Sequence, residues 1–370
     1  MIHKAKELIE VRDKVKQIDT EIEAIVKMPA LEESQKDTRQ KLLKELREKN
    51  KMFKTKLWDL EEQTIIPLLK VPNDLEPDTP TGKEWNKIIY TSDIPKENTS
   101  KIKSHAEHPL IEFDSDFPEC IFLKGDLALL EQELCHKAQC VLTEDNFAEH
   151  LSSPDIVRST VLEGCDPSGF GKPFSALALD KSSDFGDIHS GLGAHLVGSA
   201  SFPSMTTNFI KNVSRKSECL PYNYFTIGRQ YKFLESEDVI CQSLFHIQQS
   251  TCVSIICLDI EGQYQSFESL IEKIKKFYTD LDLHYRMVSV KAENLKLEES
   301  QRIETQVWSP LSQRYITVGS LSKYGDFVSK RLHMKYYDSE KNLKNYNLMH
   351  GTLIDTFKVL GCLIENKSVI

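Results

Sequence analysis

Two runs of apolar residues, spaced alternately by three and four positions, constrain the first part of this chain more than any other feature. The first run lies within residues 2–27 and the second within residues 43–60. Their members are Leu8, Val11, Val15, Ile18, Ile22 and Ile25, followed by Leu43, Leu46, Asn50, Phe53, Leu57 and Leu60, of which only Asn50 is polar. This heptad spacing places each run along one side of an α-helix, as in the seam of a coiled coil.

A break between the two runs predicts that the two helices fold back on each other. Pro29 follows Met28 there, and a proline disfavours the helical conformation of the residue before it. Pro67 indicates where the second helix ends. We therefore predict an antiparallel coiled-coil hairpin over residues 1–66, called the arm below. Two helices of an ordinary bundle would also carry apolar seams, but the strongly polar positions around these seams favour the hairpin.

Basic residues of the arm are concentrated on its second helix. The whole chain has a net charge of −9, whereas residues 1–70 hold 16 Lys and Arg and 14 Asp and Glu, a local charge of +2. Between Lys36 and Lys56, nine residues are basic and three are acidic. Away from the seam lie Lys41, Lys44, Arg47, Lys51 and Lys54, called the basic stripe below. The stripe is either a solvated face of the coiled coil or a surface that contacts RNA phosphates, and the sequence leaves both interpretations open.

The rest of the chain has the composition of an ordinary globular protein, with 40% apolar and 28% charged residues. It contains no apolar run long enough to cross a bilayer, so we expect no membrane insertion. Nine scattered cysteines without zinc-type spacing favour reduced thiols and predict no metal site. Residues 67–108, rich in Pro, Asp, Thr and Lys, are typical of a linker. In residues 109–370, β-rich runs alternate with amphipathic helices such as 267–281, and this pattern predicts only a mixed α and β body.

Three strings resemble the seryl-tRNA synthetase family of class II. Residues 71–82 (Val-Pro-Asn-Asp-Leu-Glu-Pro-Asp-Thr-Pro-Thr-Gly) resemble the family's junction between arm and catalytic body. Residues 122–131 (Phe-Leu-Lys-Gly-Asp-Leu-Ala-Leu-Leu-Glu) resemble the start of its first body helix. Residues 351–366 resemble its third signature motif, in which a glycine turn leads into a helix with a Glu-Asn end. The resemblance covers essentially the whole chain. It implies an α+β fold in which the coiled-coil arm precedes an antiparallel sheet flanked by helices.

Most of the positions that bind ATP in this family carry other residues here. In the third motif, Lys358 stands in place of an arginine, and an ammonium lacks the planar fork with which a guanidinium grips a phosphate. In the second motif, Arg229 and His246 are retained. The motif's two acids correspond to Tyr231 and Cys252, and its second arginine corresponds to Leu244. We therefore interpret Arg229, His246 and Lys358 as vestigial positions of an ATP site.

The positions that the family uses for serine recognition and for the metal are changed as well. Its T-x-E segment corresponds to residues 199–201, which end in Ser201 instead of a glutamate. A downstream motif corresponds to residues 315–331, where Thr317 replaces a metal-site glutamate and Lys323 replaces an asparagine. Gln306 replaces the glutamate of an E-V-W string. Because these acids hold Mg²⁺ and the substrate ammonium, we predict no catalytic residue, no metal and no cofactor.

The resemblance and the replacements together predict a non-catalytic member of the family. The resemblance implies a subunit that pairs with an active mitochondrial seryl-tRNA synthetase as a heterodimer, binds tRNA(Ser) through the basic stripe and supports serylation. A mitochondrial matrix location is implied only by likeness to degenerate seryl-tRNA synthetase-like proteins of insect mitochondria, and we expect no targeting segment within this chain. Two alternatives remain. One is a homodimeric RNA-binding or regulatory protein in mitochondria, and the other is a divergent ATP-dependent acyl-activating enzyme.

Overall fold

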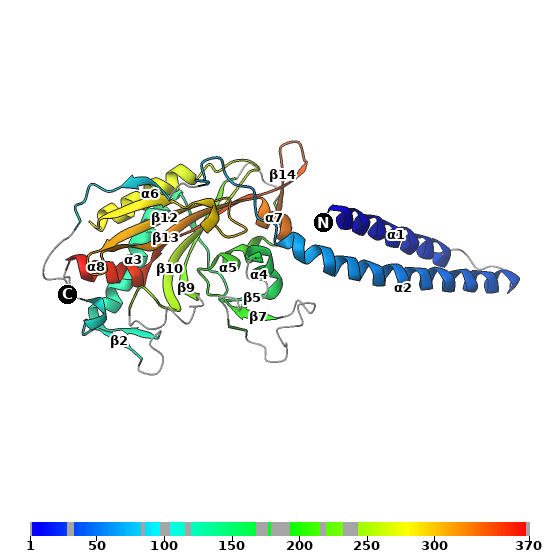
Figure 1. Ribbon diagram of the computed structural model, residues 1–370, viewed down its shortest axis with the longest axis horizontal. Helices are drawn as coiled ribbons and strands as arrows, with labels where there is room; N and C mark the ends of the chain where they lie inside the picture. The colour runs from blue at the N-terminus through cyan, green and yellow to red at the C-terminus, as the bar shows by residue number, and fades with distance from the viewer. Residues whose placement is uncertain are drawn as a thin grey trace. The chain divides into compact units, whose positions relative to one another are not determined.

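The chain divides into two units, Met1–Val71 and Pro72–Ile370, each of which has its own internal contacts (Figure 1). A computed structural model describes residues 2–27, 33–82, 86–96, 104–114, 120–167, 177–178, 193–214, 220–231 and 243–367. Within these ranges, no helix has the length and apolarity that a membrane span requires. The seven described cysteines form no disulfide, and five of them are buried.

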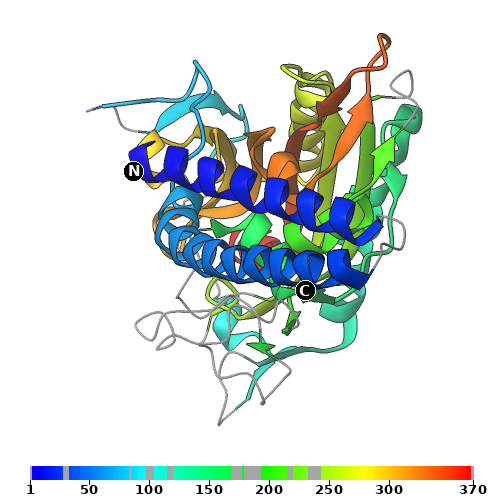
Figure 2. The same cartoon turned by 90° about the vertical axis from the view of Figure 1, so that its right-hand side faces the viewer.

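The first unit is the predicted antiparallel pair of helices, α1 (Ile2–Lys27) and α2 (Glu33–Leu69) (Figure 2). The contacts between the two helices show that they run in opposite directions. Lys4 Nζ donates to Gln63 at 3.1 Å near one end, and the Arg39 guanidinium donates to the carbonyl oxygens of Ile25 and Val26 near the other. Side chains from both predicted seams meet in one apolar cluster, which consists of Leu8, Val11 and Leu60 with Phe53 and Leu57 packed against them. The heptad pattern therefore predicted this pairing correctly.

The end of α2 differs from the prediction. The helix continues through Pro67 to Leu69, although Pro67 was expected to terminate it. Because this proline lies in the last turn, its missing N–H removes one helical hydrogen bond and leaves the rest of the helix intact.

The second unit is built on one eight-stranded sheet in the order β1-β11-β12-β13-β16-β10-β9-β4. Every neighbouring pair is antiparallel except the short β4, which runs parallel to β9. This agrees with the predicted antiparallel sheet. The strands are, in sheet order, Lys87–Thr91, Tyr285–Ser289, Gln301–Ser309, Arg314–Gly325, Asn347–Asp355, Gln249–Asp259, Tyr222–Tyr231 and Glu149–His150.

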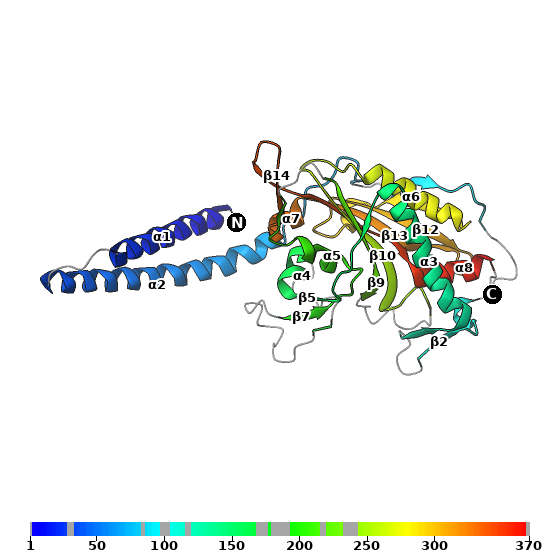
Figure 3. The ribbon, with the colours of Figure 1, turned by 180° about the vertical axis from the view of Figure 1, so that it is seen from behind.

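Helices cover both faces of this sheet (Figure 3). One face packs against α3 (Gly125–Thr143), α6 (Phe267–Asp280) and α8 (Thr356–Lys367). The other face packs against α4 (Ser159–Cys165), α5 (Phe202–Thr206) and α7 (Phe327–Leu332). Alternate residues of β10 enter the two cores, because successive side chains of a strand point to opposite faces. Ile255 belongs to the first core, whereas Ile256 belongs to the second.

Smaller elements surround the sheet. A three-stranded sheet joins β15 (Leu343–Asn345), β14 (Lys335–Tyr337) and β8 (Val213–Ser214). Another joins β5 (Ile156–Arg158), β7 (Ala194–Leu196) and β6 (Leu177–Ala178). The pair β2 (Ile111–Phe113) and β3 (Ile121–Leu123) leads into α3. Four 3₁₀ turns are described: η1 (His105–Glu107), η2 (Glu144–Asn146), η4 (Thr207–Phe209) and η6 (Ala292–Asn294).

The segment that the sequence assigned to a linker takes part in the body. Its residues 87–91 form the edge strand β1 on β11. Earlier in the segment, the Asn73 side-chain amide donates to the carbonyl oxygens of Glu298 and Tyr324 at 2.9 and 2.8 Å. Pairing partners about 200 residues away supply this structure, so the local composition alone did not predict it.

Candidate functional site

Two of the positions at which the sequence analysis expected a glutamate, that of the metal site and that of the E-V-W string, lie opposite each other on neighbouring strands. Gln306 on β12 pairs in register with Thr317 on β13, and the two side chains approach to 3.5 Å. Both donate to the same carboxylate, since Gln306 Nε2 and Thr317 Oγ1 lie 2.9 and 3.1 Å from Glu304 Oε2. Arg286 donates to Gln306 at 2.9 Å. A closed hydrogen-bond network therefore stands where the resemblance would place carboxylates.

Lys358 joins this network from helix α8. Its ammonium donates to the carbonyl oxygen of Thr317 at 3.3 Å. The one acid of the group, Glu304, also lies 3.4 Å from Arg302 Nε. Among the residues that the structure describes, no group of three or more His, Cys, Asp or Glu side chains is arranged to hold a metal ion. Mg²⁺ is usually held by carboxylates together with substrate phosphates, so this network is poorly suited to bind it.

The retained arginine of the second motif lies elsewhere, on β9. The Arg229 guanidinium lies 5.6 Å from the ring centre of Phe357 and 4.0 Å from Glu131 Oε1. It is about half-exposed. This arginine could still face an anion, although Glu131 competes for its charge.

The second half of that motif is part of the hydrophobic core. Leu244 is fully buried, and Cys252 is fully buried on β10. Leu244 and Phe245 lie directly against Gly361 of α8, where an added Cβ would come within 2.7 Å of the Phe245 ring. His246 is partly buried and follows these residues in a turn, with its N–H donating to Ser243 O. Residues 232–242, between the two halves of the motif, lie outside the described ranges.

Ser201 and Tyr231 line a cavity of about 260 Å³ on the sheet face that carries α4 and α5. Ser201 is the N-cap of α5, where its hydroxyl accepts from the Ser204 N–H and donates to Gly198 O at 2.7 Å. Gly198 has a φ of +86°, and a Cβ there would lie 2.1 Å from the Arg229 carbonyl oxygen. A glycine is therefore required for the turn before Ser201 to pack against β9.

Lys323 does not line this cavity, although Ser322 and Tyr324 on either side of it do. Its ammonium lies 3.9 Å from the ring centre of Phe267 and 4.8 Å from that of Tyr264. Burial lowers the pKa of Lys323. The alternation of β13 thus separates Lys323 from Ser201, which the sequence analysis had placed with it among the replaced serine-recognition and metal positions.

Sequence analysis missed the charged residues of this cavity, and its two buried glutamates come from the segment before β12. Glu299 is buried and accepts from Arg302 at 2.9 Å, from Ser322 Oγ at 2.7 Å and from the Lys296 N–H at 2.9 Å. Its neighbour Glu298 is equally buried. Two consecutive glutamates in a polar stretch usually indicate a surface loop, so no local signal distinguished them.

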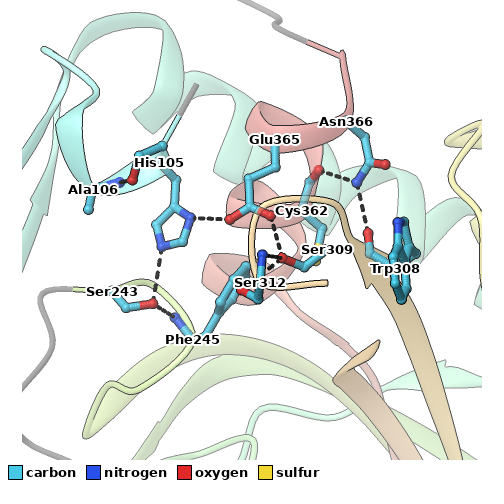
Figure 4. A network of polar contacts seen from close by, with 11 residues as sticks. His105, Ala106, Ser243, Phe245, Trp308, Ser309, Ser312, Cys362, Glu365 and Asn366 are labelled. Carbon is cyan, nitrogen blue, oxygen red and sulfur yellow. Dashed lines mark hydrogen bonds and ion pairs between the residues drawn. The ribbon is translucent and has the colours of Figure 1, made fainter. Parts of the chain in front are cut away.

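The Glu-Asn end of the third motif anchors helix α8 (Figure 4). Glu365 is buried and lies 2.8 Å from His105 Nδ1 and 2.5 Å from Ser309 Oγ, which donates to it. His105 Nε2 continues to Ser243 Oγ at 3.1 Å, and Asn366 donates to Trp308 O at 2.9 Å. Through this network α8 is bonded to His105 in η1 and to the end of β12. His105 in turn connects it to Ser243, which precedes Leu244.

On the arm, all five residues of the basic stripe are exposed. Lys54 lies 3.3 Å from Asp19 on α1. The other four members, Lys41, Lys44, Arg47 and Lys51, form no ion pair with any of the described residues. Their charges are thus accessible to an external anion.

Comparisons with known proteins agree with this architecture. The family model for the tRNA synthetase class II core domain (G, H, P, S and T) matches residues 195–367. The chain is 29% identical over 331 residues to the serine–tRNA synthetase-like protein Slimp of Drosophila melanogaster, covering 87% of this chain and 68% of that protein. It is 24% identical over 386 residues to the mitochondrial serine–tRNA ligase of Bos taurus, covering 98% and 72% of the two chains.

Solved structures show the same fold. The cytoplasmic serine–tRNA ligase of Naegleria fowleri, solved with AMP, superposes with a TM-score of 0.73 at 16% identity, over 99% of this chain and 87% of that one. The seryl-tRNA synthetase of Pyrococcus horikoshii, solved with ATP, also superposes with a TM-score of 0.73 at 16% identity, over 98% and 85%.

Proposed function

We propose that this seryl-tRNA synthetase-like protein, whose residues 195–367 form a class II tRNA synthetase core domain, acts as a non-catalytic subunit. The observation that carries the proposal is the network of Gln306, Thr317 and Glu304. Neutral side chains occupy both positions at which the resemblance implies glutamates, one of them the metal-site glutamate, and they are already hydrogen-bonded to each other and to Glu304.

The chemistry of amino-acid activation makes these replacements costly. The reaction needs charge neutralisation at the α-phosphate and fixed donors that place the carboxylate for attack. Removing one such transition-state interaction typically costs about 3 kcal/mol. Here Lys358 and Leu244 replace two arginines and Tyr231 replaces an acid, in addition to the glutamates replaced by Thr317 and Gln306. Several losses of this size would leave no useful rate.

A partner subunit would give a function to the parts of the body that still resemble the family. We propose a heterodimer with an active mitochondrial seryl-tRNA synthetase, in which that subunit performs the reaction. Exposed apolar side chains support a subunit contact on the body. Phe122, Leu129 and Ile156 are 55%, 57% and 47% exposed, and they lie in or beside the start of α3 and the Pro154 region, which resembles the first motif of class II enzymes. In that family the first motif builds the dimer interface, and Ile156 lies two residues after Pro154 in the corresponding region.

The arm would bring tRNA(Ser) to the complex. The exposed cations Lys41, Lys44, Arg47 and Lys51 support contact with RNA phosphates, which is the main source of such affinity. Two relatives support mitochondrial placement. The ligase of Bos taurus is named as mitochondrial. Slimp of Drosophila melanogaster supports it only through the likeness to insect mitochondrial proteins described above.

ATP–pyrophosphate exchange with serine tests the loss of catalysis. We expect the purified chain to exchange no faster than a buffer control. The single variant Lys358→Arg should also remain inactive, because it restores one guanidinium and none of the acids. Exchange clearly above the control would reject the proposal and favour the divergent acyl-activating enzyme.

A further inference from the structure

The network that anchors α8 contains a serine, a histidine and a glutamate bonded in series (Figure 4). Ser243 Oγ lies 3.1 Å from His105 Nε2, and His105 Nδ1 lies 2.8 Å from Glu365 Oε1. The three residues come from the segment before Leu244, from η1 and from α8, so no pattern in the sequence groups them. A nucleophile within hydrogen-bond reach of a base, which is in turn oriented by a third group, is the arrangement of an activated nucleophile.

The hydrogen bonds of this series have one direction. An ionised carboxylate only accepts, so Glu365 accepts from Ser309 Oγ at 2.5 Å and from the proton on His105 Nδ1. The neutral imidazole then has a bare Nε2, which accepts from the Ser243 hydroxyl. The Phe245 N–H donates to Ser243 Oγ at 3.1 Å. The proton of Ser243 therefore points at the base, which is the direction that serine activation requires.

Burial decreases along the series from the acid to the hydroxyl. Glu365 is 2% exposed and His105 is 4% exposed, whereas Ser243 is partly exposed. The Phe245 ring packs on the imidazole of His105 with the two ring centres 4.5 Å apart. The acid and the base are thus held in place and shielded from water, while the hydroxyl stands at the outer end of the series.

We propose that Ser243 is an activated nucleophile that takes up the acyl group of small carboxylic esters. His105 is its general base, and Glu365 is a positioning residue that acts through His105. None of the three stands at a motif position whose residue has been replaced, and the reaction is not amino-acid activation. The inference therefore goes beyond the proposed function and does not depend on it.

The acyl transfer balances without any further reactant. Ser243 Oγ attacks the carbonyl carbon of the ester and forms the new C–O bond, while its proton passes to His105 Nε2. Glu365 stabilises the imidazolium through Nδ1. The bond from the carbonyl carbon to the alcohol oxygen then breaks, and the alcohol leaves with the proton from Nε2. Water can remove the acyl group by the same steps, which releases a carboxylic acid and restores Ser243.

Labelling of the full chain with a fluorophosphonate, followed by peptide mapping, tests the nucleophile. Such a reagent phosphonylates an activated serine and releases fluoride. We expect an adduct on Ser243 that is absent after unfolding in urea, because only the fold assembles the series. Ser243→Ala should lose the adduct, and His105→Gln should slow its formation by about a hundredfold. Ser152→Ala, which removes an exposed serine outside the network, is the matched control and should label like the unmodified chain.

Hydrolysis of p-nitrophenyl acetate tests the acyl transfer. The unmodified chain should release a burst of p-nitrophenolate equal in amount to the protein, and Ser243→Ala should show no burst. Glu365→Gln keeps the shape of the side chain and should lower kcat with little change in KM, because Glu365 acts only through His105. A purely structural role of Glu365 would not produce this split between kcat and KM.

Peptide mapping of the unmodified chain keeps the test decisive if the variants fail to fold. No adduct on Ser243, or an adduct that forms equally fast in the unfolded chain, would overturn the proposal. So would equal labelling of the unmodified chain and a folded Ser243→Ala variant. ATP, serine and tRNA are absent from both assays, so either outcome leaves the proposed loss of amino-acid activation to be judged by pyrophosphate exchange.

Discussion

Single side chains explain why restoring a motif residue by residue should not restore the site. Leu244 occupies a position at which the family carries an arginine, yet it is fully buried beside Gly361 of α8. The loop that would present a guanidinium to ATP is packed here as hydrophobic core. A charged side chain placed at this position would have to leave water without gaining a partner.

We predict that Leu244→Arg destabilises the body by several kcal/mol, because it buries an unpaired charge and crowds α8. Urea unfolding followed by circular dichroism measures the change. Leu244→Met, which conserves volume, should cost less than about 1.5 kcal/mol. An arginine variant as stable as the unmodified chain would mean that the loop can turn outward and present the guanidinium.

His350 should make the body sensitive to acid. Burial, with a smaller contribution from Lys296, lowers the pKa of His350 to about 3, whereas an imidazole in the unfolded chain titrates near about 6.5. Because the folded value is the lower one, the unfolded chain binds the extra proton between these values. The stability contribution is therefore present above about pH 6.5 and is lost as the pH falls towards 3, by about 1.4 kcal/mol per pH unit.

The variant His350→Asn should accordingly show a weaker loss of stability between pH 6 and pH 4 than the unmodified chain. Urea midpoints measured across this range supply the comparison. His333→Asn is the control, since His333 is exposed and adopts a left-handed conformation that asparagine tolerates. Parallel pH profiles for the unmodified chain and His350→Asn would contradict the assignment.

At the scale of elements, the arm combines a seam that specifies pairing with a surface that remains free. Asn50 lies in the apolar seam of α2, is buried, and donates to Asp19 on α1 at 2.5 Å. A polar residue at a seam position sets the register of a coiled coil at some cost in stability. The basic stripe stands outside the seam, so its charges can be changed without altering the packing.

Reversing Lys41, Lys44, Arg47 and Lys51 to Glu should weaken tRNA binding and leave the helicity of the arm unchanged. The slope of log K against log salt should become shallower by about 0.7 to 0.9 for each phosphate that the arm no longer neutralises. Filter binding or fluorescence anisotropy over a salt series measures both effects. As a control of matched charge, the pair Lys44→Glu and Lys51→Glu is compared with Lys14→Glu and Lys16→Glu, two exposed lysines of α1. Equal tRNA binding by the two double variants would show that the basic stripe is only a solvated face of the coiled coil.

At the scale of the whole molecule, the proposed heterodimer must be distinguished from a pair of two copies of this chain. A self-pair would contain two altered sites, whereas a mixed pair would keep one working site and add this chain's arm. Exposed Phe122, Leu129 and Ile156, on β3, α3 and β5, are the apolar side chains through which we propose such a contact.

We predict that co-expression with an active mitochondrial seryl-tRNA synthetase yields a one-to-one complex by light scattering, heavier than the 42.5 kDa single chain by one synthetase subunit. Leu129→Lys should abolish the complex. Leu311→Lys, a comparable exposed leucine in the turn after β12, should leave it intact. A stable homodimer that ignores the synthetase at micromolar concentration would favour the regulatory protein.

The sequence by itself determined the features that depend on short-range patterns. Heptad spacing specified the hairpin of α1 and α2, because 3.6 residues per turn align such positions on one side of a helix. The motif strings specified the class of body and the positions that differ from the family. They also singled out Ser201 and Tyr231, from two different motifs, and both line the cavity.

Only the tertiary structure decided which of these residues act together. Strand pairing joined Gln306 to Thr317, turned Lys323 away from the cavity, and made residues 87–91 an edge strand. It also placed Glu298 and His350 at one cavity, although they lie on different segments and neither belongs to a recognised pattern. The physical reason is that a side chain's face and depth in a sheet depend on the register with distant strands, and bulges such as that between Thr305 and Gln306 shift this register locally.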